Sequence, residues 1–229
     1  MGTSFLYLAG ESIDRMEVRV IDARPDHAGF LAWAMMTAFR SHLPEGMWDL
    51  YVGGTEADCL RFLQALTLTD ERHWSHYSNH IIAEVDGRPA SALCGYFEAE
   101  CGSPHLLVGI AQANEATGRT KEDDAAGWER ADSIIYCETD HVDGAWIVEN
   151  VATLPEFRRR GLAEVLLADI LARGRSRGAK VSEIGVMIGN DPAQRAYEKA
   201  GFAVVSEKLH PEFEAVYKCP GIRGMSREL

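Results

Sequence analysis

The sequence predicts a mixed α/β (α+β) fold, and three local patterns carry that prediction. An apolar, β-branched run beginning at Trp146 stops at a proline and crosses a basic turn into a helical apolar pattern over 162–171. Residues 190–202 carry helix signals at both ends, and residues 80–96 predict two strands joined by a turn. Strand and helix patterns therefore follow one another along one chain.

One strand and two helices are expected in the first part of the chain. Alternating residues over 17–23 predict the first strand, and a helix starts after it at Pro25. Thr55, followed three residues later by Asp58, predicts the capped start of the second helix. The apolar positions of these two helices are Phe30, Leu31, Trp33, Ala34, Ala38 and Phe39, then Cys59, Phe62, Leu63 and Leu66.

A hairpin and a long connection are expected next. The strands 80–85 and 90–96 flank the turn-prone pair Asp86 and Gly87. The segment 99–144 is then longer than a hairpin connection needs, and two short apolar patterns inside it indicate helical pieces. This segment could form the wall or the lid of a ligand pocket. It could equally be a segment that only packs against the rest of the protein, and the sequence leaves both possibilities open.

The basic turn before the pattern 162–171 has the features of an anion site. It lies where a helix begins, so free backbone N–H groups and the positive end of the helix dipole point at it. Gly161 and Ala163 allow close approach to the backbone, and positive charge comes from Arg158, Arg159 and Arg160. The turn therefore predicts a phosphate site, with a shape suited to a diphosphate.

The spacing differs from that of the common nucleotide loops, because neither the P-loop nor the dinucleotide-fold glycine pattern is present. Instead, Arg158-x-x-Gly161-x-Ala163 resembles the Arg/Gln-x-x-Gly-x-Gly/Ala signature of the Gcn5-related N-acetyltransferase (GNAT) superfamily. In that family the loop, here including Leu162, holds the pyrophosphate of acetyl-coenzyme A. Arg159 departs from the pattern, since many members have glycine there. A basic helix start without a ligand is the plainer alternative.

A second block carries the same resemblance. Asp191 is expected to cap a helix, with Pro192 at its first position, Gln194 in a capping-box-like pair and Gly201 in the left-handed position past its end. The block resembles the family motif Asn-x-x-Ala-x-x-x-Tyr-x-x-x-Gly-Phe, which matches at Asn190, Ala193, Tyr197, Gly201 and Phe202.

The resemblance implies a GNAT fold over 17–229. This is a central, mixed, mostly antiparallel, twisted sheet of six to seven strands flanked by about four helices, with the insertion between strands 3 and 4. The closing strands would be 202–208 and 213–218, with a short tail from Pro220. It also implies acetyl-CoA as cosubstrate. Splayed strands would hold the pantetheine and the thioester carbonyl through backbone groups of Val151, Ala152 and Thr153.

Acyl transfer to an amine needs a neutral nitrogen and a proton for the leaving thiolate. Glu149, two residues before Val151 and so expected on the same face, is the candidate base, directly or through a water. A structural carboxylate is the alternative. In relatives the tyrosine at the position of Tyr197 often lies near the thioester sulfur, which makes it the candidate acid. The alternative role for Tyr197 is structural, as an amphipathic side chain that anchors its helix to the core.

Two classes of function follow. The first is an acetyl-CoA-dependent N-acetyltransferase that moves an acetyl group to the amine of a small molecule, peptide or protein by direct attack in a ternary complex. The second is a non-catalytic acyl-CoA-binding or sensing module with the GNAT fold. They differ in whether Glu149 and Tyr197 face the thioester. Many relatives form dimers, so the resemblance allows a homodimer.

Composition agrees with an ordinary globular protein, since 46% of the residues are apolar and 25% charged. The five cysteines include no Cys-x-x-Cys pair, so neither a disulfide framework nor a zinc ribbon is expected, and a reducing cytoplasm is the simplest compartment. No run approaches the roughly 18 to 20 apolar residues of a membrane span, so no membrane is expected. Residues 1–16 are expected to be an extension before a single domain, 17–229.

The net charge of −12 disfavours a nucleic-acid partner, because phosphate backbones need a basic surface. Acidic residues concentrate between 115 and 143, where nine acids stand against three bases. This charge either attracts a cationic amine or simply keeps the protein soluble, and the sequence favours solubility.

Three histidines, His73, His76 and His80, would share one face of a continuous helix and could then bind a metal. Ser78 and Asn79, however, resemble the boundary before a strand, which would break that face. We therefore expect surface histidines here and no metal site.

Overall fold

The computed structural model describes residues 17–229 and contains one seven-stranded sheet in the order β1-β2-β3-β4-β5-β7-β6. Every neighbouring pair is antiparallel except β4 and β5, which are parallel. The expected extension over 1–16 lies outside the described residues. The strands are β1 Val18–Asp22, β2 His80–Val85, β3 Arg88–Phe97, β4 Trp146–Thr153, β5 Val181–Met187, β6 Ala203–Leu209 and β7 Gly221–Glu228.

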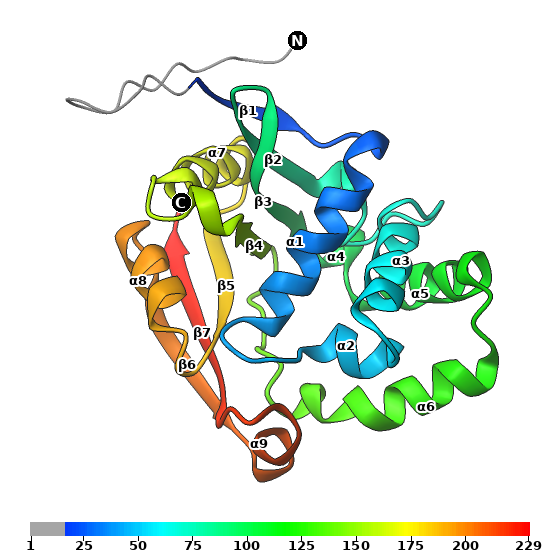
Figure 1. Cartoon of the computed structure of the whole chain (residues 1–229). Helices are drawn as coiled ribbons and strands as arrows, with labels where there is room; N and C mark the ends of the chain where they lie inside the picture. Colours follow the sequence, from blue (N-terminus) through cyan, green and yellow to red (C-terminus); the bar gives the residue numbers. More distant parts are fainter. Residues whose placement is uncertain (1–16) are drawn as a thin grey trace.

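Helices cover the sheet and fill the connection between β3 and β4 (Figure 1). Within residues 17–229 they outnumber the four or so that the resemblance implies, because that connection alone adds α4, α5 and α6. The helices are α1 Ala28–Arg40, α2 Met47–Val52, α3 Glu56–Thr67, α4 Glu98–Cys101, α5 Ser103–Thr117, α6 Lys121–Ala131, α7 Leu162–Ser176, α8 Asp191–Lys199 and α9 Pro211–Tyr217. Short 3-10 segments span Pro25–His27, Tyr77–Asn79, Asp132–Tyr136 and Pro155–Phe157.

The two faces of the sheet are buried against different helices, as period-2 alternation requires. On β2, Ile81 packs in the cluster beneath α7, together with Leu166 and Ile170. Its neighbour Ile82 packs on the other face against Leu31 of α1. The sheet is therefore sandwiched between α7 and α1.

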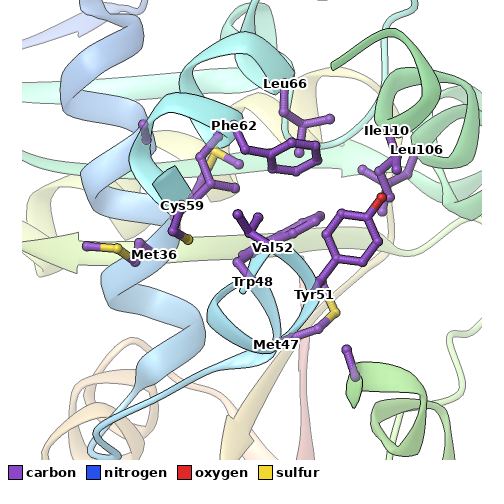
Figure 2. Packing of buried hydrophobic residues seen from close by; sticks show 14 of the residues in the cluster. Met36, Met47, Trp48, Tyr51, Val52, Cys59, Phe62, Leu66, Leu106 and Ile110 are labelled. Atoms are coloured by element: carbon purple, nitrogen blue, oxygen red, sulfur yellow. The ribbon is translucent and has the colours of Figure 1, made fainter. Parts of the chain in front are cut away.

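A second hydrophobic core lies beyond α1 and joins it to α2, α3 and α5 (Figure 2). Trp48 and Phe62 are almost completely buried there, at 0% and 1% exposure. Tyr51 packs between them, and its hydroxyl is hydrogen-bonded to Asp124 and Asn114 of the β3–β4 connection. The connection is thus an integral part of the core.

The N-terminal predictions hold at the level of elements. The Thr55 hydroxyl accepts from the Asp58 N–H at 3.3 Å, and Asp58 accepts from the Thr55 N–H at 3.0 Å, so the capping box at α3 is confirmed. The helix α2 was not foreseen, because its six residues are too few to show a period.

The C-terminal predictions were partly wrong. The segment 213–218 was expected as a strand, but 213–217 belong to α9, which starts with Pro211 and buries Phe213 and Tyr217 one helical turn apart. The expected tail after Pro220 is the strand β7, which lies between β5 and β6. Glycine and arginine at four of its eight positions hide the usual β-branched strand signal.

The expectation of surface histidines was also wrong for His73 and His80, which are 0% and 1% exposed. The His73 ring contacts the Thr69 hydroxyl at 3.0 Å, and the His80 ring donates to the His76 carbonyl at 3.1 Å. Burial lowers the pKa of His73 to about 3 and that of His80 to about 4, so both rings are neutral. Within residues 17–229, no group of three His, Cys, Asp or Glu side chains could hold a metal ion.

None of the helices found in 17–229 has both the length and the apolar character to cross a membrane. All five cysteines are buried and unpaired.

Candidate active site

The strands β4 and β5 separate halfway along their length. They pair only where Trp146–Val148 faces Ser182–Ile184. Beyond Val148 the facing edges of the two strands have no partner strand among residues 17–229, so their backbone N–H and C=O groups are available to a ligand. The gap lies close to the middle of the sheet (Figure 1).

A bulge in β4 accompanies the separation. The β3–β4 register shifts between Ala92 and Cys94, and Asn150 takes the left-handed φ of +59°. Val148 and Val151 consequently both pack beneath α7, which regular alternation would forbid. Glu149 lies instead opposite Cys94, so the expectation that it shares a face with Val151 was wrong.

A cavity of about 650 Å³ occupies the gap and extends toward the β3–β4 connection. Its size is in the range of small-molecule and cofactor sites. On the strand side it is lined by Val148–Thr153 of β4 and Ile184–Met187 of β5, and by Asn190, Pro192, Ala193 and Tyr197 around α8. The opposite wall comes from the C-terminal end of α1, from Trp74 before β2, from Tyr96 of β3 and from the β3–β4 connection, which contributes Glu98, Leu106, Trp128 and Glu138.

The basic turn leads from β4 into α7 as the sequence predicts. Gly161 precedes the helix with φ +78°, and the N–H groups of Leu162, Ala163 and Glu164 donate to no protein group in the part of the chain described. Nothing lies within 4 Å of a Cβ built on Gly161, so the backbone is open there. This helix start has the chemistry of an anion site.

The three arginines of the turn differ in their surroundings. The Arg158 guanidinium donates to the Thr153 carbonyl at 3.1 Å, which holds it at the end of β4. The Arg160 guanidinium lies over the Phe157 ring, 5.5 Å from the ring centroid. Arg159 is exposed and has φ +61°, a conformation that favours glycine.

Arg159→Gly should therefore stabilise the fold slightly. Relief of the left-handed strain, about 1 to 2 kcal/mol, is partly offset by the greater entropy of an unfolded glycine, which leaves a gain of about 0.5 kcal/mol. Urea unfolding at matched pH would measure it. A midpoint lower than that of the unsubstituted protein would contradict this account of the φ angle.

The predicted site residues divide into two groups. Eight line the cavity: Glu149, Val151, Ala152, Thr153, Arg158, Asn190, Ala193 and Tyr197. The other five lie in the turn and the first turn of α7, next to Arg158 in the chain, and do not line it: Arg159, Arg160, Gly161, Leu162 and Ala163.

The helix α8 is capped one residue earlier than expected. Asn190, in place of Asp191, accepts from the Ala193 N–H at 3.2 Å, and its amide donates to Ser41 Oγ at 2.7 Å, which ties α8 to the end of α1. Gln194 forms no capping box and contacts Glu198 and Arg223 instead.

The end of α8 is as predicted. Gly201 has φ +88°, and the Phe202 N–H donates to the Tyr197 carbonyl at 3.0 Å, as in a Schellman motif. Together the two caps hold Tyr197 against the cavity.

Glu149 is enclosed by protein while its side chain reaches the cavity. Burial raises the pKa of this carboxyl to about 7, and the nearby negative charges of Glu138 and then Glu98 add to the shift. Residues 17–229 supply no basic side chain within salt-bridge distance of it. A carboxyl that titrates near neutral pH can take and release a proton under physiological conditions.

Tyr197 is 7% exposed and lines the same cavity. Burial, and then the negative charge of Glu149, raises the pKa of its phenol, so the hydroxyl stays protonated at neutral pH. Its electrostatic coupling to Glu149 places the two groups near each other.

Sequence reasoning missed Tyr96, Glu98 and Glu138, which lie near Glu149. Tyr96 lies at the carboxyl end of β3, opposite Ile147 of β4 in the register, and Glu98 begins α4 directly after β3. A polar pair at the end of the strand before β4 is a signal that could have indicated the first two. Glu138 lies far along the connection and carries no such signal.

Comparison with known proteins shows the family. The profile of the acetyltransferase (GNAT) family matches residues 45–202, and the chain therefore belongs to this family. No curated protein matches the sequence.

Several solved structures share the fold at low sequence identity. An acetyltransferase is 16% identical with a TM-score of 0.65, over 91% of this chain and 98% of that one. An N-acetyltransferase from Staphylococcus aureus Mu50 is 17% identical with a TM-score of 0.62, over 90% and 98%. A GNAT-family acetyltransferase from Streptococcus pneumoniae is 14% identical with a TM-score of 0.51, over 93% and 99%.

Proposed function

We propose that this protein is an acetyl-CoA-dependent N-acetyltransferase that acts on the amine of a small molecule, peptide or protein by direct attack in a ternary complex. The observation that carries the proposal is that Glu149 and Tyr197 both line the same cavity, at the separation of β4 and β5. Family membership supports the chemistry. We also propose that the connection between β3 and β4 walls the acceptor half of this cavity within a single domain.

The residues present fit a coenzyme with a diphosphate and an extended arm. The start of α7 offers N–H groups that donate to no described residue of the chain, and the arginines of the turn add positive charge. The unpaired edge of β4 from Val151 to Thr153 suits the amides of the pantetheine arm and the thioester carbonyl. When bound, the cosubstrate supplies the activated acetyl carbon.

Glu149 is the base in this mechanism. Its carboxylate takes a proton from the ammonium group of the acceptor, directly or through a water, which leaves a nitrogen lone pair for attack on the thioester carbon. Because burial raises the pKa of Glu149 to about 7, the group is a stronger base than an exposed carboxylate. The C–N bond forms as the C–S bond breaks, and the nitrogen then loses its second proton, which replaces through solvent the proton that Tyr197 gives to the sulfur. Glu149 releases its own proton to solvent.

Tyr197 donates a proton to the departing sulfur. Tyr197→Phe is expected to lower kcat about tenfold, a modest effect because a thiol has a pKa near 8.5 and water can also protonate the thiolate. Steady-state kinetics with saturating amine would measure the change. An unchanged kcat with a raised KM for acetyl-CoA would instead assign Tyr197 to packing of the coenzyme arm.

Calorimetric titration with acetyl-CoA, followed by thiol-release assays on a panel of amines, tests the proposal. We expect micromolar binding, about −8 kcal/mol, and turnover with at least one amine. Absence of acetyl-CoA binding would refute the donor.

The second candidate is a non-catalytic acyl-CoA-binding or sensing module. It would bind acetyl-CoA without turnover of any amine. The position of both Glu149 and Tyr197 on the cavity wall favours the enzyme.

A further inference from the structure

The acceptor half of the cavity is unusually rich in negative charge. Glu98, Glu138 and Glu149 all line it, and none of the three forms a salt bridge with a described residue of the chain. Glu98 accepts one hydrogen bond, from the Ser103 N–H at 3.0 Å. Burial, and then the negative charges of Glu138 and Glu98, raise the pKa of Glu149.

The basic side chains on the cavity wall do not neutralise this charge. Arg158 lies at the end of β4 and donates to the Thr153 carbonyl. His141 contacts the buried carboxylate of Glu183 at 2.9 Å. His42 lies beside Ser41 at the end of α1, with its ring nitrogen 3.4 Å from the hydroxyl.

Tyr96 gives a second, independent indication of a ligand. It is 3% exposed and lines the cavity, yet its hydroxyl has no hydrogen-bond partner in 17–229. Burial raises the pKa of this phenol, and Glu149, Glu98 and Glu138 all contribute to the shift, which places the hydroxyl among the three carboxylates. Because Tyr96 lines the cavity, its hydroxyl can donate to or accept from a ligand atom there.

The remaining wall of this half is apolar. Trp74 stacks on Tyr96 with ring centroids 5.8 Å apart, and Leu106, Trp128 and Ile134 line the same space. Leu107 and Ile135 also line it and are 56% and 60% exposed, which leaves apolar surface at the rim. Such a wall suits a hydrocarbon segment between polar ends.

The inference drawn from these observations rests on the proposed function and specifies its acceptor. A simple monoamine pairs with Glu149 alone, and its alkyl chain would then lie beside the half-buried carboxylate of Glu98, the exposed carboxylate of Glu138 and the Tyr96 hydroxyl without pairing with any of them. We infer that the acceptor is a dication, a primary alkylammonium joined through an apolar chain to a second cationic group that Glu98, Glu138 and the Tyr96 hydroxyl bind.

Matched pairs of amines test the inference: 1,5-diaminopentane against pentylamine, and 1,8-diaminooctane against octylamine. Within each pair only the second amino group differs. We expect kcat/KM to favour the diamine of at least one pair about tenfold, as one charge pair at half-buried Glu98 and one at exposed Glu138 allow. Equal or higher kcat/KM for both monoamines would overturn the inference.

Variants of Glu98 and Glu138 test whether these carboxylates cause the preference for diamines. In the double variant Glu98→Gln, Glu138→Gln, the ratio of diamine to monoamine should fall to within about threefold of unity. Glutamine keeps the acceptor for the Ser103 N–H, so α5 keeps its start. The control is Glu100→Gln, which removes a charge from the same short helix but pairs with Arg177 at 2.7 Å and does not line the cavity. A preference that persists in the double variant would exclude this site.

Direct binding separates this inference from the proposed function. Calorimetric titration of the full chain with 1,8-diaminooctane and with octylamine needs no acetyl transfer. Diamine binding that weakens in the double variant but not in Glu100→Gln supports the site even if no amine is acetylated. Acetylation of amines without preference between the members of a pair would keep the enzyme and reject the dication.

Discussion

Replacing Glu149 by Gln is expected to lower kcat/KM for amine acetylation about 100- to 1000-fold at pH 7.5, the usual contribution of a positioned base. Glutamine has nearly the same shape but cannot take a proton. The affinity for acetyl-CoA should stay within about threefold of that of the unsubstituted protein, because the side chain faces the acceptor. Kinetics and calorimetry on the same preparation measure both quantities.

The dependence of kcat/KM on pH is a second test of Glu149 as the base. The base form of Glu149 predominates above its pKa of about 7, so kcat/KM of the unsubstituted protein should fall as the pH drops below 7. The variant should lose this limb. An acceptor that is already neutral at the assay pH, such as trifluoroethylamine, should be affected far less by the substitution. An equal loss with that amine would assign Glu149 to structure.

Glu149→Gln should lower activity but raise the free energy of unfolding at high pH. The folded state raises the pKa of Glu149, so it favours the neutral form, and this contribution to stability is complete below the unfolded pKa of about 4.5 and lost as the pH rises through about 7. Glu149→Gln should therefore gain about 1 to 3 kcal/mol relative to the unsubstituted protein at pH 8, and little at pH 4. Urea unfolding at both pH values checks the difference.

The second large effect is expected at the helix start. Gly161→Asp should weaken acetyl-CoA binding about 100-fold or more, because it puts a negative charge and a Cβ where an anion would meet the free N–H groups of α7. The φ of +78° adds backbone strain, which lowers stability as well. Calorimetric titration with acetyl-CoA measures the affinity.

Gly87→Asp is a matched control for the strain. Gly87 has φ +76° in the β2–β3 turn, with nothing within 4 Å of an added Cβ, as at Gly161. It does not line the cavity, so its substitution should destabilise similarly while the affinity for acetyl-CoA is retained. Comparable loss of affinity in both variants would show that strain, and not the charge at α7, causes the effect.

The parts of the site predicted from the sequence are those built by neighbours in the chain. The turn before α7 and the two ends of α8 depend on residues within about five positions of each other, so capping and left-handed glycines are readable directly. Even there the cap of α8 was misplaced by one residue, since Asn190 and Asp191 are equally good cap residues.

The parts that were missed depend on distant packing. The strand β7 has a weak pattern of its own and is held in place by pairing with β5 and β6 on both sides. The bulge at Asn150 reversed the expected face of Val151, because a single left-handed residue shifts the alternation that a linear reading assumes to continue.

By itself, the sequence determined the family, the helix start at Gly161 as a candidate anion site, and Glu149 and Tyr197 as candidate catalytic residues, since short-range geometry and motif spacing suffice for these. Only the tertiary structure decided that Glu98, Tyr96 and Glu138 join Glu149 on one cavity. Their charges interact because the sheet order and the β3–β4 connection bring them together, and electrostatic coupling depends on distance in space.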